Sequence, residues 1–139
     1  LKIAGEGPEE KILHDHSSAL HIDYLGKVNH EDISYVYADA DIVVVPSRSE
    51  PFGLVAIEAM AMGKYVIASD VGGLHEILSE QWKLGMLVEP DEPYALSKAI
   101  RDGLQLSRDF DLAQFRRKYA YENFAWHEIA KKTINVYRY

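Results

Sequence analysis

The run IVVVP at positions 42–46 constrains the fold of this chain more than any other feature. It is apolar throughout and rich in β-branched residues, which is the pattern of a strand buried on both faces, and such strands occur in parallel sheets. Other short apolar runs alternate with segments of helical periodicity almost to the end of the chain. Strands and helices joined by short loops build right-handed βαβ units. We therefore predict an α/β fold with an open parallel sheet and helices on both faces.

The expected elements follow this alternation along the chain. Strands are predicted at residues 1–5, 22–26, 42–46, 64–70 and 85–90, with helices at 7–16, 30–40, 54–62 and 74–78 between them. Three extra C-terminal helices are expected at residues 93–106, 109–121 and 124–137. The length of 139 residues and the absence of a low-complexity linker indicate one domain, residues 1–139. In such sheets ligands bind beyond the carboxyl ends of the strands.

Composition narrows the classes of partner. The net charge of −7 argues against DNA or RNA, whose binding depends largely on Lys and Arg. The chain has no Cys, and His14 and His16 have no third ligand at a suitable spacing, so we expect no metal. The apolar runs are far shorter than the roughly 20 residues of a membrane span. No secretory signal is visible, so the cytoplasm is the expected compartment.

Glu58 is the only charged residue in the apolar helical segment LVAIEAMAM, residues 54–62. Burying an unpaired carboxylate is costly, so this side chain must face either solvent or a hydrogen-bonding partner. Two interpretations stay open. Glu58 lies on a solvated stripe of the helix, or it faces a cleft where its two oxygens accept hydrogen bonds from the vicinal hydroxyls of a ribose.

Glu50 precedes Glu58 by eight positions and lies in the loop SRSEPFG. The first free N–H groups of the following helix, near Gly53, Leu54 and Val55, form an anion site of the kind that holds phosphate. A carboxylate beside phosphate is reasonable if it reaches a neutral hydroxyl or a developing cation, and a sugar-nucleotide donor presents both. The alternative is an ordinary helix start, where acidic residues are favoured by the helix dipole.

Two glycine pairs and one cation are weaker candidates. Gly72 and Gly73 precede a helix and could direct N–H groups at an anion, although such pairs are common in tight turns. Gly5 and Gly7 lack the third glycine of a dinucleotide-binding fingerprint. Arg48 is near the proposed phosphate site, and a solvated surface position is the alternative for it.

Residues 39–78, DADIVVVPSRSEPFGLVAIEAMAMGKYVIASDVGGLHEIL, resemble the donor-binding half of retaining glycosyltransferases of the GT-B fold, most closely glycosyltransferase family 4, also called group 1. The specific part is PSxxEPFGLxxxEAMAxGxxVIASxxGG, which contains both glutamates. The flanking pieces IAGEGPE, YLGKV, GMLVEP and FAWHEIAKKTINVY agree in order but are less specific. The resemblance implies a Rossmann-like sheet, the C-terminal half of a GT-B fold.

The resemblance also implies roles for matching positions. Glu50 would be catalytic, contacting the donor's sugar hydroxyls near the reacting centre, and Glu58 would hold the ribose diol. The other implied donor-binding positions are Phe52, Gly53, Leu54 and Val55 at the diphosphate and sugar, Gly5 and Gly7 at the nucleotide cleft, Val28 with Lys27 at the base, and Gly72 and Gly73. No metal or other cofactor would be needed, because helix N-termini and basic side chains neutralise the diphosphate.

Some parts of the family are not in this sequence. Members have a further strand before the position that matches Leu1, with a loop whose Arg and Lys grip the diphosphate, and an N-terminal domain that binds the acceptor. Because that strand is central in the family's sheet, we expect the sheet to be interrupted between the first and third strands of this chain. We also expect that these 139 residues alone transfer no sugar.

The full-length protein is accordingly expected to bind a nucleotide-sugar donor and to transfer the sugar with retention of configuration. Its expected location is the cytoplasm, with peripheral association at the inner face of the membrane as the alternative. Two other functions stay open at this point: a sugar-nucleotide epimerase of related architecture, and a non-catalytic α/β module such as a receiver domain.

Overall fold

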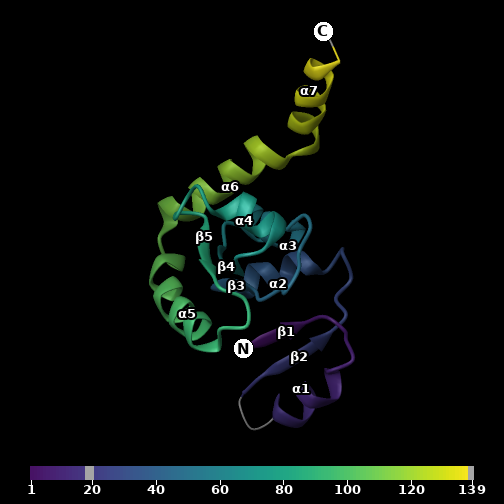
Figure 1. Ribbon diagram of the computed structural model, residues 1–139, viewed down its shortest axis with the longest axis vertical. Helices are drawn as coiled ribbons and strands as arrows, with labels where there is room; N and C mark the ends of the chain where they lie inside the picture. The colour runs from purple at the N-terminus through teal and green to yellow at the C-terminus, as the bar shows by residue number, and fades with distance from the viewer. Residues whose placement is uncertain (18–20, 138–139) are drawn as a thin grey trace. The chain divides into compact units, whose positions relative to one another are not determined.

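The structure is a computed structural model, and it describes residues 1–17 and 21–137 (Figure 1). The chain divides into two compact units, Leu1–Val36 and Tyr37–Tyr139.

The first unit contains a pair of parallel strands. Strand β1 (Lys2–Ala4) pairs with β2 (Asp23–Gly26), and helix α1 (Glu10–Ser17) connects them. Helix α2 (Ile33–Asp39) begins in this unit and ends in the next. Beyond the strand ends, the Gly5 N–H donates to the carbonyl of Gly26 at 2.8 Å, and the Tyr24 hydroxyl donates to the carbonyl of Gly5 at 2.6 Å. Gly5 is therefore fixed at the carboxyl end of β1.

The second unit is built on a three-stranded parallel sheet. Strands β3 (Ile42–Val45), β4 (Tyr65–Ser69) and β5 (Gly85–Val88) pair in the order β3-β4-β5. All five residues of the central strand β4 are buried, as expected for a strand with neighbours on both sides and helices on both faces. The β-branched run for which a buried parallel strand was predicted is β3. The strand is parallel, but it lies at an edge of this three-stranded sheet, and only Val45 is buried while its other residues are half-buried.

The strands thus form two sheets, and within residues 1–17 and 21–137 no strand pairing joins them. Every pairing is parallel. The predicted α/β class with parallel strands and several C-terminal helices is confirmed. The expected interruption between the first and third strands agrees with this hydrogen-bond pattern.

Helices cover both faces of the second sheet (Figure 1). Successive residues of a strand point to opposite faces, so β4 contributes Tyr65 and Ile67 to one side and Val66 and Ala68 to the other. Tyr65 and Ile67 pack with Ala99 of α5 (Pro93–Ser107). The remaining helices are α3 (Leu54–Ala61), α4 (Gly72–Leu78), α6 (Phe110–Phe124) and α7 (Trp126–Val136). Helix α4 begins two residues earlier than predicted, because the glycine pair is part of it.

Helix α3 ends in a glycine-dependent turn. The Gly63 N–H donates to the Met60 carbonyl at 2.8 Å, and the Lys64 N–H donates to the Ala59 carbonyl at 2.9 Å. Gly63 adopts φ 76°, which a residue with a Cβ adopts only with strain. This turn directs the chain from α3 back into β4.

Arg116 of α6 joins three elements of the second unit from inside the core. Its side chain is fully buried, and its guanidinium donates to the carbonyls of Lys83 (2.8 Å), Gly63 (3.2 Å) and Leu106 (3.3 Å). The guanidinium also lies 4.9 Å from the ring centroid of Tyr65. Burial lowers the pKa of Arg116. The charge is tolerated because every contacting carbonyl accepts a hydrogen bond from it.

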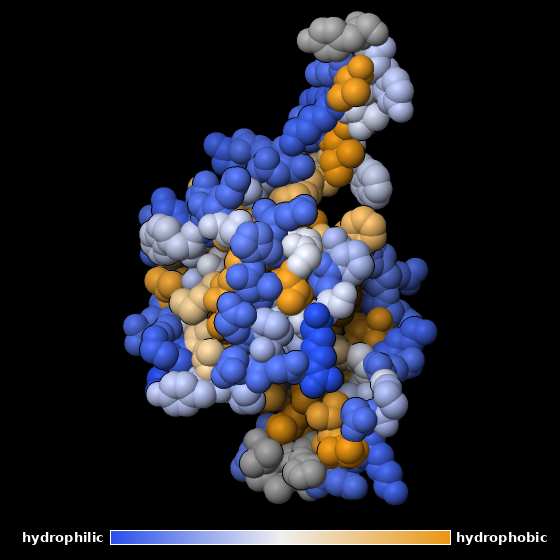
Figure 2. Space-filling model, viewed as in Figure 1, coloured by the Kyte–Doolittle hydropathy of each residue, from blue (hydrophilic) through white to orange (hydrophobic). Residues whose placement is uncertain are grey.

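Helix α7 contains no buried residue. Apolar side chains are exposed along it, and Figure 2 shows them as a stripe on that helix. They include Ile129, Ile134 and Val136. None of the helices described in the structure combines the length and the apolar character that crossing a membrane requires.

Candidate functional site

The candidate site lies where the strands of the second sheet end. Because β3, β4 and β5 are parallel and in register, with Val45 opposite Ala68 and Ser69 opposite Val88, the segments that follow them share one edge of the sheet. The longest of these segments, residues 46–53, connects β3 to α3 and carries Glu50.

The carboxylate of Glu50 organises its own loop. Its Oε1 atom accepts hydrogen bonds from the N–H groups of Phe52 (3.3 Å) and Gly53 (3.1 Å), and the side chain is half-buried. These bonds bend the chain into the first turn of α3. The Oε2 atom has no hydrogen-bond partner among the residues that the structure describes, so one carboxylate oxygen is available to a ligand.

The free N–H groups at the start of α3 are those of Leu54 and Val55. The structure gives neither of them a hydrogen bond to any residue within 1–17 or 21–137, whereas Ala56 and Ile57 already bond to the carbonyl of Gly53. Phe52 and Gly53 were also expected to bind the diphosphate, but their N–H groups already donate hydrogen bonds to Glu50. The first two helical N–H groups lie at the positive end of the helix dipole and can donate hydrogen bonds to a bound anion.

The glycine pair packs against this loop. The Gly73 N–H donates to the Glu50 carbonyl at 2.8 Å. A Cβ at Gly72 would overlap that same carbonyl oxygen, and a Cβ at Gly73 would lie 2.7 Å from the carbonyl carbon of Phe52. These two glycines therefore allow α4 to approach the Glu50 loop closely, and the Gly73 N–H is already engaged by the protein.

A buried tyrosine holds the carboxylate of Glu58. The Tyr37 hydroxyl donates to Glu58 Oε2 at 2.9 Å, across 21 positions in sequence. Tyr37 is 6% exposed and Glu58 is half-buried. Burial, followed by the hydrogen bond to Glu58, raises the pKa of the Tyr37 hydroxyl. Glu58 therefore occupies neither a fully solvated stripe nor an unpaired buried position.

Two polar pairs lie at the same edge. Asp70, directly after β4, contacts His75 Nδ1 at 2.5 Å. Arg48 donates to Asp91 at 2.8 Å, and this pairing raises the pKa of Arg48. Both Arg48 and Asp91 are exposed, so Arg48 is a surface cation, as the alternative interpretation had it, but one with an acidic partner.

Gly5, Gly7 and Val28 belong to the first unit, where Gly5 and Gly7 follow β1 and Val28 follows β2. A Cβ at Gly5 or Gly7 would meet no atom within 4 Å. Their proposed contacts with a nucleotide stay a prediction.

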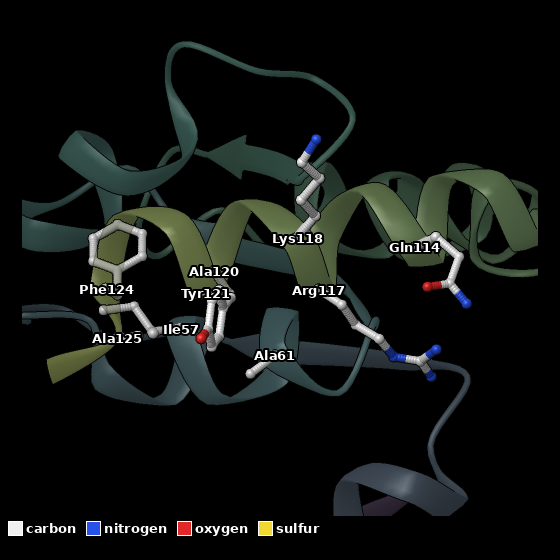
Figure 3. A pocket seen from close by; sticks show the side chains of 9 residues that line it. All are labelled: Ile57, Ala61, Gln114, Arg117, Lys118, Ala120, Tyr121, Phe124 and Ala125. Atoms are coloured by element: carbon white, nitrogen blue, oxygen red, sulfur yellow. The ribbon is translucent and has the colours of Figure 1, made fainter. Parts of the chain in front are cut away.

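Two hollows open on the α6 side of α3. One, of about 560 Å³, lies between α3 and α6, and Figure 3 shows its lining side chains, among them Ile57, Arg117, Lys118 and Phe124. The other, of about 380 Å³, is lined by Phe52, Leu54 and Gly73, with Ile57 and Phe124 again at its wall. Glu50 and Glu58 line neither of them.

No group of three or more His, Asp or Glu side chains that could hold a metal ion is found in the described parts of the chain.

Tyr37 is the residue of this site that sequence reasoning missed. Tyr37 lies in the helix predicted at residues 30–40, and no role was predicted for it. A buried tyrosine must place its hydroxyl against an acceptor. The lone carboxylate of Glu58 was the obvious acceptor that this rule could have identified.

Comparisons with known proteins identify the family of this chain and its fold. The model of the family described as "Glycosyl transferases group 1" matches residues 1–123. An uncharacterized glycosyltransferase of Methanocaldococcus jannaschii is 38% identical over 99% of this chain, which corresponds to 36% of that protein.

Solved structures resemble the chain over nearly its whole length. Sucrose-phosphate synthase from Thermosynechococcus elongatus has a TM-score of 0.80 at 34% identity, over 99% of this chain and 37% of that one. The Anabaena protein HepE, solved with UDP and with UDP-glucose, has TM-scores of 0.76 and 0.72 at 27% identity, over 97% of this chain and 39% of HepE. The chain thus spans 36–39% of the length of these relatives.

Proposed function

The chain belongs to the group 1 glycosyl transferases, and on that premise we propose that it is the donor-binding part of a longer glycosyltransferase. The donor is a nucleoside-diphosphate sugar. The observation that carries this proposal is the pair of half-buried carboxylates flanking the start of α3, each with one oxygen left for a ligand. The HepE complexes with UDP and UDP-glucose support the same class of donor.

In this proposal the diphosphate binds at the N-terminus of α3. The free N–H groups of Leu54 and Val55 donate to its oxygens, and the helix dipole adds a favourable field. Backbone donors of this kind need no divalent cation, so we propose a metal-independent site. A bound metal ion is the other common way to stabilise negative charge on phosphoryl oxygens.

The two carboxylates then serve different parts of the donor. Glu58, one turn into α3, accepts a hydrogen bond from the ribose. The free oxygen of Glu50 faces the transferred sugar and stabilises positive charge that develops at its anomeric carbon as the diphosphate leaves. Transfer to an acceptor with retention of configuration is the reaction we propose for the full-length protein, whose further parts supply the acceptor site.

A binding experiment tests this proposal. The full-length protein is titrated calorimetrically with UDP, GDP and ADP, and then with sugar derivatives of the tightest binder, with and without EDTA. We expect one nucleotide to bind with a dissociation constant in the micromolar range and to keep its affinity in EDTA. Absence of binding by all three nucleotides in both conditions would contradict a donor site, and binding that EDTA abolishes would contradict the metal-free site.

A further inference from the structure

The hydrogen bond between Tyr37 and Glu58 can orient the Glu58 carboxylate as well as satisfy a buried hydroxyl. Tyr37 lies in the last turns of α2, with 6% of its surface exposed. Its hydroxyl is 2.9 Å from Glu58 Oε2. Both residues belong to the second compact unit, so their relative placement is part of one folded body.

The bond fixes a side chain that would otherwise be mobile. Glu58 is attached to a helix whose other residues are apolar, so the helix itself offers its carboxylate no polar neighbour. A glutamate side chain has several rotatable bonds, and ordering it on binding a ligand has an entropic cost. With Oε2 held by Tyr37, that cost is met in the free protein. Oε1 has no hydrogen-bond partner in residues 1–17 and 21–137.

We propose that Tyr37 is a positioning residue for the nucleotide: it orients Glu58 so that the Oε1 atom meets a ribose hydroxyl. This inference rests on the proposed function, since it assumes that Glu58 binds the ribose. Groups preorganised in this way discriminate between ligands more sharply than mobile ones. A tyrosine hydroxyl is protonated at neutral pH in any case, and an ionised carboxylate can only accept, so Tyr37 acts as the donor toward Glu58.

A simpler role would be structural. The hydroxyl needs an acceptor in the protein interior, and Glu58 supplies one. Loss of the hydroxyl would then lower stability but would leave the ligand preference unchanged. Ribose discrimination therefore separates the two roles, whereas a melting temperature does not.

The test compares ribose and deoxyribose nucleotides in the full-length protein. UDP, GDP and ADP are titrated first, and the tightest of them is then compared with its 2′,3′-dideoxy counterpart. We expect the wild-type protein to prefer the ribonucleotide by about tenfold or more, the value of one good hydrogen bond to a charged group. In Tyr37→Phe this preference should fall by about three- to tenfold. The matched control is Tyr35→Phe, because Tyr35 lies on the same helix but is 74% exposed; its preference should equal that of the wild type.

The outcomes distinguish this inference from the function on which it rests. If the wild-type protein binds both nucleotides equally, the ribose role of Glu58 fails and Tyr37 has no such ligand to position. If the wild type discriminates and Tyr37→Phe discriminates equally well, the donor site stands but Tyr37 is a packing residue only.

A second measurement is independent of whether Tyr37→Phe folds. In a crystal structure of the wild-type protein with the nucleotide bound, Glu58 should keep its bond to Tyr37 and contact the ribose through its other oxygen. A ribose bound by both carboxylate oxygens, with the Tyr37 hydroxyl displaced, would overturn the inference.

Discussion

The backbone N–H of Gly73 donates a 2.8 Å hydrogen bond to the carbonyl oxygen of Glu50. This bond ties the first turn of α4 to the loop whose side chain organises the start of α3. The approach depends on the absence of a Cβ, which at Gly73 would lie 2.7 Å from the Phe52 carbonyl carbon and 2.8 Å from the Pro51 oxygen.

Gly73→Ala should therefore be destabilising. The Cβ can be accommodated only by moving backbone, and overpacking of this kind costs roughly 1–3 kcal/mol. Because the Glu50 loop must shift, nucleotide affinity should fall as well. Urea unfolding and calorimetric titration measure the two effects. Gly7→Ala, where a Cβ meets nothing within 4 Å, is the stability control and should stay within about 0.5 kcal/mol of the wild type. Equal stability of the two variants would show that the close approach does not constrain the loop.

Substitutions of the two carboxylates should change different kinetic parameters. In the full-length protein, Glu58→Ala should weaken donor binding by about tenfold or more, because a charge-assisted hydrogen bond contributes roughly 1.5–3 kcal/mol. Glu50→Ala should lower kcat more than it raises KM, because its oxygen acts on charge that develops in the transition state. Steady-state rates of nucleoside-diphosphate release give both parameters. Glu122→Ala, exposed on α6, serves as the control. Small and equal effects at Glu50 and Glu58 would mean that both carboxylates are structural.

Among the cations of the second unit, Arg116 should be the one whose substitution lowers the free energy of unfolding most. Arg116→Met leaves the buried carbonyl of Gly63 and the partly buried carbonyls of Lys83 and Leu106 without their donor. A buried acceptor left unsatisfied costs roughly 1–3 kcal/mol and a partly buried one less, so we expect a loss of about 2 kcal/mol or more in the free energy of unfolding.

The neighbouring Arg117 provides the matched control for this experiment. It is exposed and donates a long hydrogen bond, 3.4 Å, to the Met62 carbonyl. Arg117→Met should change the free energy of unfolding by about 0.5 kcal/mol or less. If the two methionine variants unfold at the same urea concentration, the three carbonyl bonds of Arg116 contribute no net stability.

The Tyr37–Glu58 bond should also make stability depend on alkaline pH. The pKa of Tyr37 is raised in the folded protein above its ordinary value of 10.0, so the folded state keeps a proton that the unfolded state loses. The stabilising contribution of Tyr37 is therefore complete below pH 10 and declines above it, by about 1.4 kcal/mol per pH unit.

Subtracting the free energy of unfolding of Tyr37→Phe from that of the wild type isolates this effect, because the other tyrosines titrate in both proteins. Urea unfolding at several values between pH 8 and pH 11 gives the difference. We expect it to be constant up to about pH 10 and to shrink beyond. A difference that does not change over this range would contradict the raised pKa.

Local patterns were enough to predict most of the secondary structure. The β-branched run at residues 42–46 predicted a parallel strand, and Pro93 marked the start of α5. Both were predictable because each depends on residues that are close in sequence. The predicted burial of the strand was not reached, because β3 lies at an edge of its sheet. The break in the sheet was expected from the family resemblance and not from a local pattern.

The interactions that complete the site were not predictable in the same way. Tyr37 bonds to Glu58 across 21 positions in sequence, and Gly73, at the start of α4, bonds to Glu50 in the loop before α3. A helix was predicted at residues 109–121, but periodicity alone does not indicate that a cation in it, Arg116, is buried. Its burial depends on three carbonyls that come from distant segments.

The most direct measurement is a crystal structure of the full-length protein with its nucleoside-diphosphate sugar. We expect the ribose hydroxyls within hydrogen-bonding distance of Glu58, the diphosphate at the N–H groups of Leu54 and Val55, and Glu50 beside the sugar. A donor bound with its ribose and diphosphate away from α3 would contradict the central claim that this helix and its two carboxylates form the donor site.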